Sequence, residues 1–349
     1  MRVGFVNPGM DGELFWLLVS ATMQAAAGQL NIDVDIRYTK RNYERAIQIT
    51  KDFLAETPPP DYLVATNDIG VGGDVIKLAD AAGVPLILLS NDLDPKDWKT
   101  YGEPRTKYRR WLGSIVPDHE GGGYEIAEAV LGEAQRIKST RPLNLIALAG
   151  DAETPASNDR VHGLQRAFGV FQQLLGKDAV KMVAFANGDW TEAGAYAWMK
   201  QVLPTVPRAD AVWAANDPMA FGLLRALEEA GYNPGKDVVV GGLNWSQGGI
   251  DRVLNGEMLL THGGHFLGGA WVMVLIRDHR DGRDFAEEDV RLQFPMGAFY
   301  KPIAQRFPDI GKIDWRRVDF RSFSKSRNPN VQRYAFTPDA VLNQLPAAR

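Results

Sequence analysis

The chain has 349 residues, of which 45% are hydrophobic and 23% are charged, with a net charge of −4 and no cysteine. Because a single hydrophobic core rarely grows beyond roughly 250–300 residues, this length predicts two domains. The lack of cysteine excludes thiolate nucleophiles, disulfides and cysteine-ligated metals. The slightly acidic balance argues against nucleic acid as the main partner.

The chain carries no sign of a membrane-spanning segment. No apolar stretch approaches the roughly 20 residues that a transmembrane helix needs. The first strand is expected to start near residue 2, so no secretory signal precedes it. Two locations stay open at this point: the cytoplasm, or the periplasm with a signal peptide already removed.

Short β-rich runs alternate with amphipathic segments of helical length along most of the chain. The predicted strands cover residues 2–7, 32–38, 61–66, 85–90, 111–116, 143–149, 179–185, 210–214, 237–243 and 257–262. The predicted helices cover residues 14–29, 41–55, 71–82, 120–138, 158–175, 191–203, 217–231 and 265–279. Such alternation predicts an α/β fold of parallel sheets with right-handed crossovers. So many strands fit two sheets better than one, with a first boundary near 112–118.

Polar and aromatic residues follow the expected strands, at the edge where open parallel sheets bind ligands. They include Asn7 to Trp16, Ser90 to Asp92, Arg160, Trp190, Asn216 and Asp217, Asn244 and Trp245, and His262 to His265. Amides and acids exchange directional hydrogen bonds with hydroxyl groups. Aromatic faces cover the C–H face of a sugar ring. The set therefore indicates a ligand with many hydroxyls and flat apolar faces.

Adjacent aromatic rings begin the first predicted helix. Spacing predicts that Leu14, Leu17, Leu18, Ala21 and Ala25 form its buried face, and Trp16 then shares a more polar face with Ser20 and Gln24. A tryptophan on the surface or in a contact between lobes is the plain alternative. We expect instead that Phe15 and Trp16 face a cleft.

Two other patterns have structural interpretations. Asp217 followed by Pro218 predicts a helix N-cap, which leaves Asn216 free to face the cleft. His262 and His265 lie at a strand end without an evident third ligand, so no metal site is expected. Phosphate-binding, dinucleotide and nucleophile-elbow motifs are missing. We therefore expect a protein that is not an enzyme and uses no cofactor.

Several segments resemble one family over roughly residues 2–300. They are AGVPLILLSND (82–92), VPDHEGGGYEIAE (116–128), TPASNDRVHGLQRAF (154–168), DAVWAANDPMAFGLLRALEEAG (210–231) and VVVGGLNW (238–245). Together with Phe15 and Trp16, they are similar to type I periplasmic sugar-binding proteins of the ribose/galactose-binding group. That group shares its fold with the effector domain of LacI-type repressors.

The resemblance implies two doubly wound parallel-sheet lobes joined by three hinge crossings, near 112–118, 260–265 and 294–301. The N-terminal lobe would comprise residues 1–115 and 263–296. The C-terminal lobe would comprise residues 116–262 and 297–349, including an irregular C-terminal extension. A ligand would be captured between the lobes by hinge closure.

The resemblance also implies ligand-binding positions. Phe15 and Trp16 from one lobe and Trp190 from the other would sandwich a ring. Asn91, Arg160, Asn216 and Asn244 fall on hydrogen-bonding positions of the family, with His265 beside one on the hinge. Further candidates nearby are Asp92, Trp245 and Asp11.

Two departures from the family pattern concern charge. Many pentose and hexose binders carry Asp-Arg where this chain has Ser90-Asn91, and Asp where it has Asn244. Losing charged partners weakens bonds to sugar hydroxyls, so a ligand other than ribose or galactose is expected.

The resemblance predicts a monomeric periplasmic protein that binds a sugar or polyol for the membrane permease of an ABC transporter. The alternative is a sensory receptor for a small sugar-like signal, coupled to a membrane sensor kinase. The Asn after the fourth strand and the long tail are somewhat closer to the autoinducer-2 receptor branch of the family.

Overall fold

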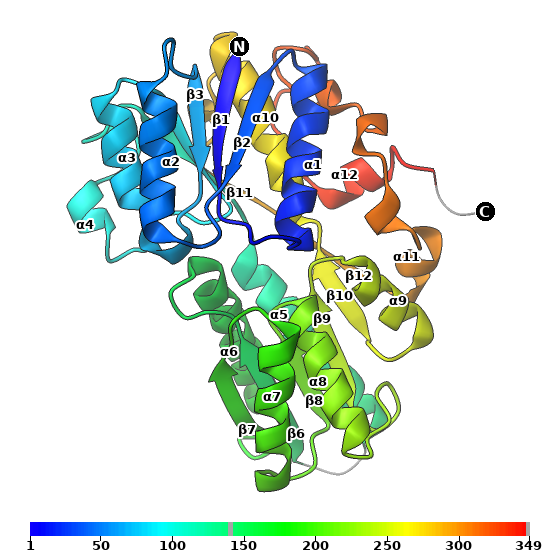
Figure 1. Ribbon diagram of the computed structural model, residues 1–349. Helices are drawn as coiled ribbons and strands as arrows, with labels where there is room; N and C mark the ends of the chain where they lie inside the picture. Colours follow the sequence, from blue (N-terminus) through cyan, green and yellow to red (C-terminus); the bar gives the residue numbers. More distant parts are fainter. Residues whose placement is uncertain (139–141, 347–349) are drawn as a thin grey trace.

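The computed structural model describes residues 1–138 and 142–346 and folds into two lobes, each built on a six-stranded sheet (Figure 1). The first sheet has the order β11-β5-β4-β3-β1-β2 and every neighbouring pair is parallel. Its strands are β1 (Arg2–Asn7), β2 (Asp33–Tyr38), β3 (Tyr62–Ala65), β4 (Leu86–Leu89), β5 (Trp111–Pro117) and β11 (Arg291–Phe294). Its helices are α1 (Leu14–Gln29), α2 (Tyr43–Ala55), α3 (Gly72–Ala81), α4 (Trp98–Tyr101) and α10 (Gly268–Arg280).

The second sheet has the order β12-β10-β9-β8-β6-β7. Only β12 runs antiparallel to its neighbour. The strands are β6 (Leu143–Ala149), β7 (Val180–Asn187), β8 (Ala211–Ala214), β9 (Val239–Leu243), β10 (Leu260–Gly263) and β12 (Gly297–Tyr300). The helices are α5 (His119–Ile137), α6 (Pro155–Leu175), α7 (Glu192–Val202), α8 (Asp217–Glu229), α9 (Gln247–Asn255) and α11 (Lys301–Arg306).

Alternation along the strands builds a core on both faces of the first sheet. Phe5 of β1 is fully buried in the cluster that contains Val19 and Met23 of α1, whereas its neighbour Val6 joins the cluster of Phe53 from α2. Successive side chains of a strand point to opposite faces. A sheet that is covered on both faces therefore needs the continuous apolar runs noted in the sequence.

The chain passes between the lobes three times. It crosses after β5 into α5, after β10 through the 3₁₀ turn η3 (His265–Leu267) into α10, and between β11 and β12. These crossings lie where the family resemblance implied them. They bring the carboxyl ends of the parallel strands of both sheets toward the boundary between the lobes (Figure 1).

The C-terminal segment contacts both lobes, whereas residues 297–349 were all expected in the second. β12 and α11 lie there, and η5 (Ile310–Lys312) contacts α9. The turns η6 (Trp315–Arg317) and η7 (Phe320–Phe323), however, contact α1 of the first lobe, and η7 also contacts α10. Helix α12 (Pro338–Leu342) closes the described tail, and residues 347–349 lie outside the described part of the chain.

Burial explains why the tail returns to the first lobe. Helix α10 is buried on all sides from Gly268 to Ile276, so its outer face needs an apolar cover. Rings of the tail supply it, since Phe336 stacks on Trp271 at 4.7 Å and Phe323 packs edge-on at 4.8 Å. Asp278 accepts hydrogen bonds from the Ser324 hydroxyl and the Lys325 backbone at 2.5 and 2.7 Å.

The predicted buried face of α1 is wrong at its N-terminal end. Leu14 is 63% exposed and Leu17 is 44% exposed, whereas Trp16 is 3% exposed. Val19 and Met23 turn toward the sheet instead. Apolar residues occupy every face of this helix, so spacing alone does not fix its rotation. Among residues 1–138 and 142–346, no helix combines the length and apolarity needed to cross a bilayer.

Candidate functional site

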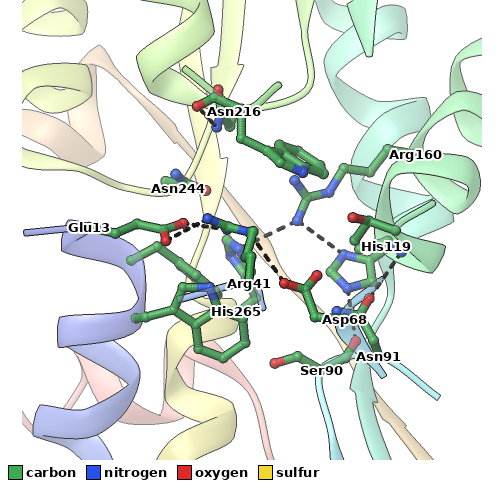
Figure 2. Close-up of a pocket in the computed structure, with 15 residues that line it drawn as sticks. Glu13, Arg41, Asp68, Ser90, Asn91, His119, Arg160, Asn216, Asn244 and His265 are labelled. Atoms are coloured by element: carbon green, nitrogen blue, oxygen red, sulfur yellow. Dashed lines mark hydrogen bonds and ion pairs between the residues drawn. The ribbon is translucent and has the colours of Figure 1, made fainter. Parts of the chain in front are cut away.

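A cavity lies between the two lobes and contains about 490 Å³ of space, part of it open to solvent. The first lobe contributes side chains that follow β1, β2, β3 and β4: Glu13, Phe15, Trp16, Arg41, Asp68, Ser90 and Asn91. The second lobe contributes Thr154, Ala156, Arg160, Trp190, Asn216 and Asn244, and the crossings contribute His119 and His265 (Figure 2).

The lobes are closed over this cavity. Residues from both sides are almost inaccessible, with Asp68 at 3%, Asn91 at 4% and Arg160 at 4% exposure. The side-chain oxygen of Asn91 accepts a hydrogen bond from the Ala156 backbone N–H at 3.0 Å, which joins the first lobe to the start of α6. These buried groups are largely shielded from water, and polar contacts between them are stronger than on the surface.

Most of the predicted positions come together here. Those that line the cavity are Phe15, Trp16, Asn91, Arg160, Trp190, Asn216, Asn244 and His265.

Three predicted positions do not line the cavity. Asp92 accepts a hydrogen bond from Ser114 at 2.7 Å, and Trp245 stacks on Phe299 at 4.1 Å in the core. Asp11 is exposed and pairs with Lys40 at 2.6 Å. Each of the first two follows a cavity residue, Asn91 or Asn244.

Asn216, not Asp217, is the N-cap of α8. Its side-chain oxygen accepts from the Met219 N–H at 2.8 Å, and its amide donates to the Trp190 carbonyl at 3.0 Å. Asp217 is fully buried and accepts from Ser246 and Thr261 at 2.7 and 2.8 Å. The N-cap prediction for Asp217 was therefore wrong, whereas Asn216 does line the cavity, and its amide helps to hold Trp190 in place.

Trp190 lies flat over the backbone of the second lobe. A Cβ on Gly150 would be 2.1 Å from its ring, so only glycine allows this approach. Its φ is +68°, and the φ of Ser90 across the cavity is +67°. Unfavourable backbone conformations of this kind concentrate at functional sites.

The aromatic residues of the first lobe form a wall with a histidine. Phe15 stacks on His265, with ring centroids 4.4 Å apart and planes at 22°, and meets Trp16 edge-on at 5.0 Å. On the opposite side, the guanidinium of Arg160 lies 5.5 Å from the Trp190 ring. The predicted sandwich of a ligand ring between these walls stays a prediction.

Arg160 lies between two histidines at the centre of the cavity (Figure 2). It donates to the Ala215 carbonyl at 2.8 Å and to His119 Nδ1 at 3.2 Å, and His265 Nε2 is 3.5 Å away. His119 Nε2 lies 3.2 Å from the Ser90 carbonyl, which assigns the proton to this nitrogen and leaves Nδ1 as the acceptor. Burial and the Arg160 charge lower the pKa of both histidines, which keeps them neutral.

A second charged cluster, formed by Arg41, Glu13 and Asp68, lines the same cavity from the first lobe. Arg41 donates to both carboxylate oxygens of Glu13, at 2.8 and 2.6 Å, and its Nε is 3.2 Å from Asp68. Burial raises the pKa of Asp68 to about 6, although the positive charge of Arg41 opposes this. Carboxylates in such a position can accept hydrogen bonds from ligand hydroxyls.

Several cavity residues were not named as ligand-binding positions, although the strand-end segments 7–16 and 90–92 already contained Glu13 and Ser90. They are Glu13, Arg41, Asp68, Ser90, His119, Thr154 and Ala156. Arg41 and Asp68 follow β2 and β3, so the preference of ligands for the carboxyl ends of parallel strands could have identified them. Each residue is, however, equally typical of an ordinary surface loop. His119 begins α5, and its charged neighbours favoured a purely structural role.

Metal binding has no support in the described residues. No three of their His, Asp or Glu side chains form a group that could hold an ion. His262 contacts Glu125 at 2.8 Å and does not line the cavity.

Comparison with known proteins agrees with this geometry. Residues 3–265 match the family described as periplasmic binding protein domain. The chain belongs to this family. The chain is 28% identical to the ribose import binding protein of Escherichia coli over 247 residues, covering 71% of this chain and 74% of the relative. It is 23% identical to the galactofuranose-binding protein of Escherichia coli over 266 residues, covering 74% and 75%.

A solved structure extends the similarity to the whole chain. A periplasmic sugar-binding protein from Pseudomonas fluorescens is 30% identical and superposes with a TM-score of 0.87, covering 98% of this chain and 99% of the other. The predicted membership of the type I periplasmic sugar-binding proteins is thereby confirmed, as is the α/β fold with two parallel-dominated sheets.

Proposed function

We propose that this periplasmic binding protein captures a sugar or polyol between its lobes and delivers it to the permease of an ABC import system. The observation that carries the proposal is the closed cavity, in which amides, carboxylates and guanidinium groups from both lobes surround aromatic rings. Hydroxyl groups need directional donors and acceptors, and sugar C–H faces need flat apolar cover. Relatives named as ribose and D-apiose import binding proteins support transport as the purpose.

Binding and closure are linked in this mechanism. Glu13 and Asn91 belong to the first lobe and Asn216 and Arg160 to the second, so a ligand that contacts all four favours the closed arrangement. Such a ligand shifts the equilibrium by the difference between its affinities for the open and closed forms. The closed form would then present both lobes to the permease.

A ligand panel tests this function. Pentoses, hexoses, polyols and the corresponding sugar acids are added to the protein, and the melting temperature is measured. A ligand that binds only the folded state raises the melting temperature. At a free ligand concentration of 100 times its dissociation constant, it adds about 2.7 kcal/mol to the free energy of unfolding. We expect a rise with at least one member. No rise with any member would contradict the proposal.

Trp190→Ala tests whether the cavity is the site. Loss of a ring face is expected to weaken binding of the identified ligand about 10- to 100-fold in isothermal titration calorimetry. Phe185→Ala is the matched control, because Phe185 of β7 precedes Trp190 in the same lobe and is 44% exposed. Unchanged affinity in Trp190→Ala would place the ligand elsewhere.

A further inference from the structure

Arg160 is a buried cation without a carboxylate partner. Its guanidinium contacts one backbone carbonyl, two neutral histidines and the Trp190 ring. In the described part of the chain no aspartate or glutamate forms an ion pair with it. Asp159 is exposed and acts on it only through space. Burial without such a partner lowers the pKa of Arg160 to about 9, which still leaves it charged at neutral pH.

Arg41 shows the contrast within the same cavity. That arginine has two carboxylates, Glu13 at 2.6 Å and Asp68 at 3.2 Å. A buried charge is costly unless it is paired, and an unpaired one costs several kcal/mol. The first-lobe cluster therefore needs no anion, whereas the site around Arg160 needs one.

Within residues 1–138 and 142–346, the cavity residues carry several side-chain atoms without a hydrogen-bond partner: donors of Arg160, His265, Ser90 and Arg41, and one acceptor, Oδ2 of Asp68. Nε of Arg160 has no hydrogen-bond partner among the described residues, and neither does Nδ1 of His265. Because His265 Nε2 faces the Arg160 guanidinium, Nδ1 of the neutral ring carries the proton. The Ser90 hydroxyl is also unpartnered and can donate. A negatively charged acceptor satisfies the donors of Arg160, His265 and Ser90 better than a hydroxyl does, whereas Oδ2 of Asp68 needs a donor such as a ligand hydroxyl.

We propose that the natural ligand is a sugar acid whose carboxylate binds at Arg160 and whose hydroxyls face Asn91, Asn216 and the Asp68 carboxylate. This proposal rests on the proposed function and narrows its ligand class. At Arg160 itself, one guanidinium matches one carboxylate, while Arg41 with Glu13 and Asp68 carries a net charge of −1 on the first lobe. A phosphate carries about −1.5 to −2 at neutral pH and would leave excess charge buried.

Matched ligand pairs test the proposal in isothermal titration calorimetry at pH 7.5. The pairs are galactose and galacturonate, glucose and gluconate, and ribose and ribonate, together with glucose 6-phosphate. For at least one pair, we expect the acid to bind at least about 100-fold more tightly than the neutral sugar, and the phosphate to bind weakly.

A neutral sugar that binds as tightly as its acid would overturn the proposal and leave the sugar-binding function intact. A sugar phosphate that binds better than every acid would also overturn it. Failure of every ligand would count against the proposed function itself.

Two substitutions locate the carboxylate. Arg160→Gln removes the charge and is expected to reduce the preference for the acid over the neutral sugar from about 100-fold to less than 5-fold. Arg160→Lys keeps the charge and is expected to retain part of the preference. Arg225→Gln is the control, because Arg225 is exposed over the Tyr196 ring on the surface of the second lobe. An unchanged preference in Arg160→Gln would overturn the assignment of the carboxylate to Arg160. If that variant does not fold, the ratio measured for the unmodified protein still decides the ligand class.

Discussion

The guanidinium of Arg160 holds its position through His119, which must stay neutral to accept its hydrogen bond. Since burial lowers the folded-state pKa of His119 and His265 well below 6.5, protons bind these rings more readily in the unfolded chain. Their contribution to stability is therefore present above about pH 6.5 and is lost as the pH falls below it.

We expect His119→Gln to flatten this pH dependence. A glutamine can accept from Arg160 and donate to the Ser90 carbonyl without titrating. Below pH 6.5, the free energy of unfolding of the variant should fall less steeply than that of the unmodified protein. The two slopes are expected to differ by about 1.4 kcal/mol per pH unit. Urea unfolding between pH 5 and 7.5 measures the slopes. His162→Gln, on the exposed side of α6, should keep the original slope; equal slopes in all three proteins would contradict the account.

Much of the cavity could be predicted from single residues, because the strand ends mark it. Asn91, Arg160, Trp190 and Asn244 were found in this way. The N-cap role of Asn216 could not be predicted, since Asn and Asp are both good N-caps and the sequence does not fix where the helix begins to within one residue. Arg41 and Asp68 were missed because loop charges are common, and only the fold shows that they are turned inward.

At the scale of elements, two glycines allow α6, the helix that carries Arg160, to pack closely against α5. A Cβ on Gly123 of α5 would lie 2.1 Å from the Arg160 carbonyl oxygen. A Cβ on Gly163 of α6 would lie 2.0 Å from the Glu120 carbonyl oxygen. The two helix backbones therefore touch, and any larger residue must push α6 and its arginine away from the hinge.

Gly163→Ala is expected to lower stability by about 1–3 kcal/mol, since overpacking forces the backbones apart, and to weaken ligand binding because Arg160 moves. Urea unfolding and calorimetric titration measure both effects. Gly169→Ala on the same helix is the matched control. Nothing lies within 4 Å of its Cβ position, so alanine should stabilise α6 by about 0.5–1 kcal/mol. Loss of stability in the control but not in Gly163→Ala would refute this packing.

Element positions were predicted closely where strands are apolar and helices long. β6 and α1 have the bounds expected from the sequence, Leu143–Ala149 and Leu14–Gln29. β11 and β12 were missed as strands, because RLQF and GAFY are short and not clearly alternating. Helix α9 was missed because it has nine residues, two of them adjacent glycines. Its stability comes from packing, which single-residue preferences do not report.

For the whole molecule, the tail is the part that sequence patterns placed least well. It passes from the second lobe, where η5 contacts α9, to α1 and α10 of the first. Its helix α12 also reaches the hinge, since a Cβ on Gly264 would lie 2.9 Å from Pro338. Side chains such as Trp315 and Phe320 gave it apolar character without periodicity. The tail packs on helices of both lobes, so the surface that it covers exists only in the folded molecule and cannot be recognised from the sequence of the tail.

Because the sequence has no cysteine, introduced cysteines can be labelled selectively, and closure of the lobes on a sugar ligand can be tested directly. Glu44→Cys on α2 and Glu192→Cys on α7 place spin labels at exposed positions of opposite lobes. Pulsed electron–electron double resonance then measures the distance between them, with and without the ligand that raises the melting temperature. We expect the ligand to convert a longer, broad distribution of distances into a shorter, narrow one. A distribution that stays the same when the ligand binds would contradict closure of the lobes on the ligand.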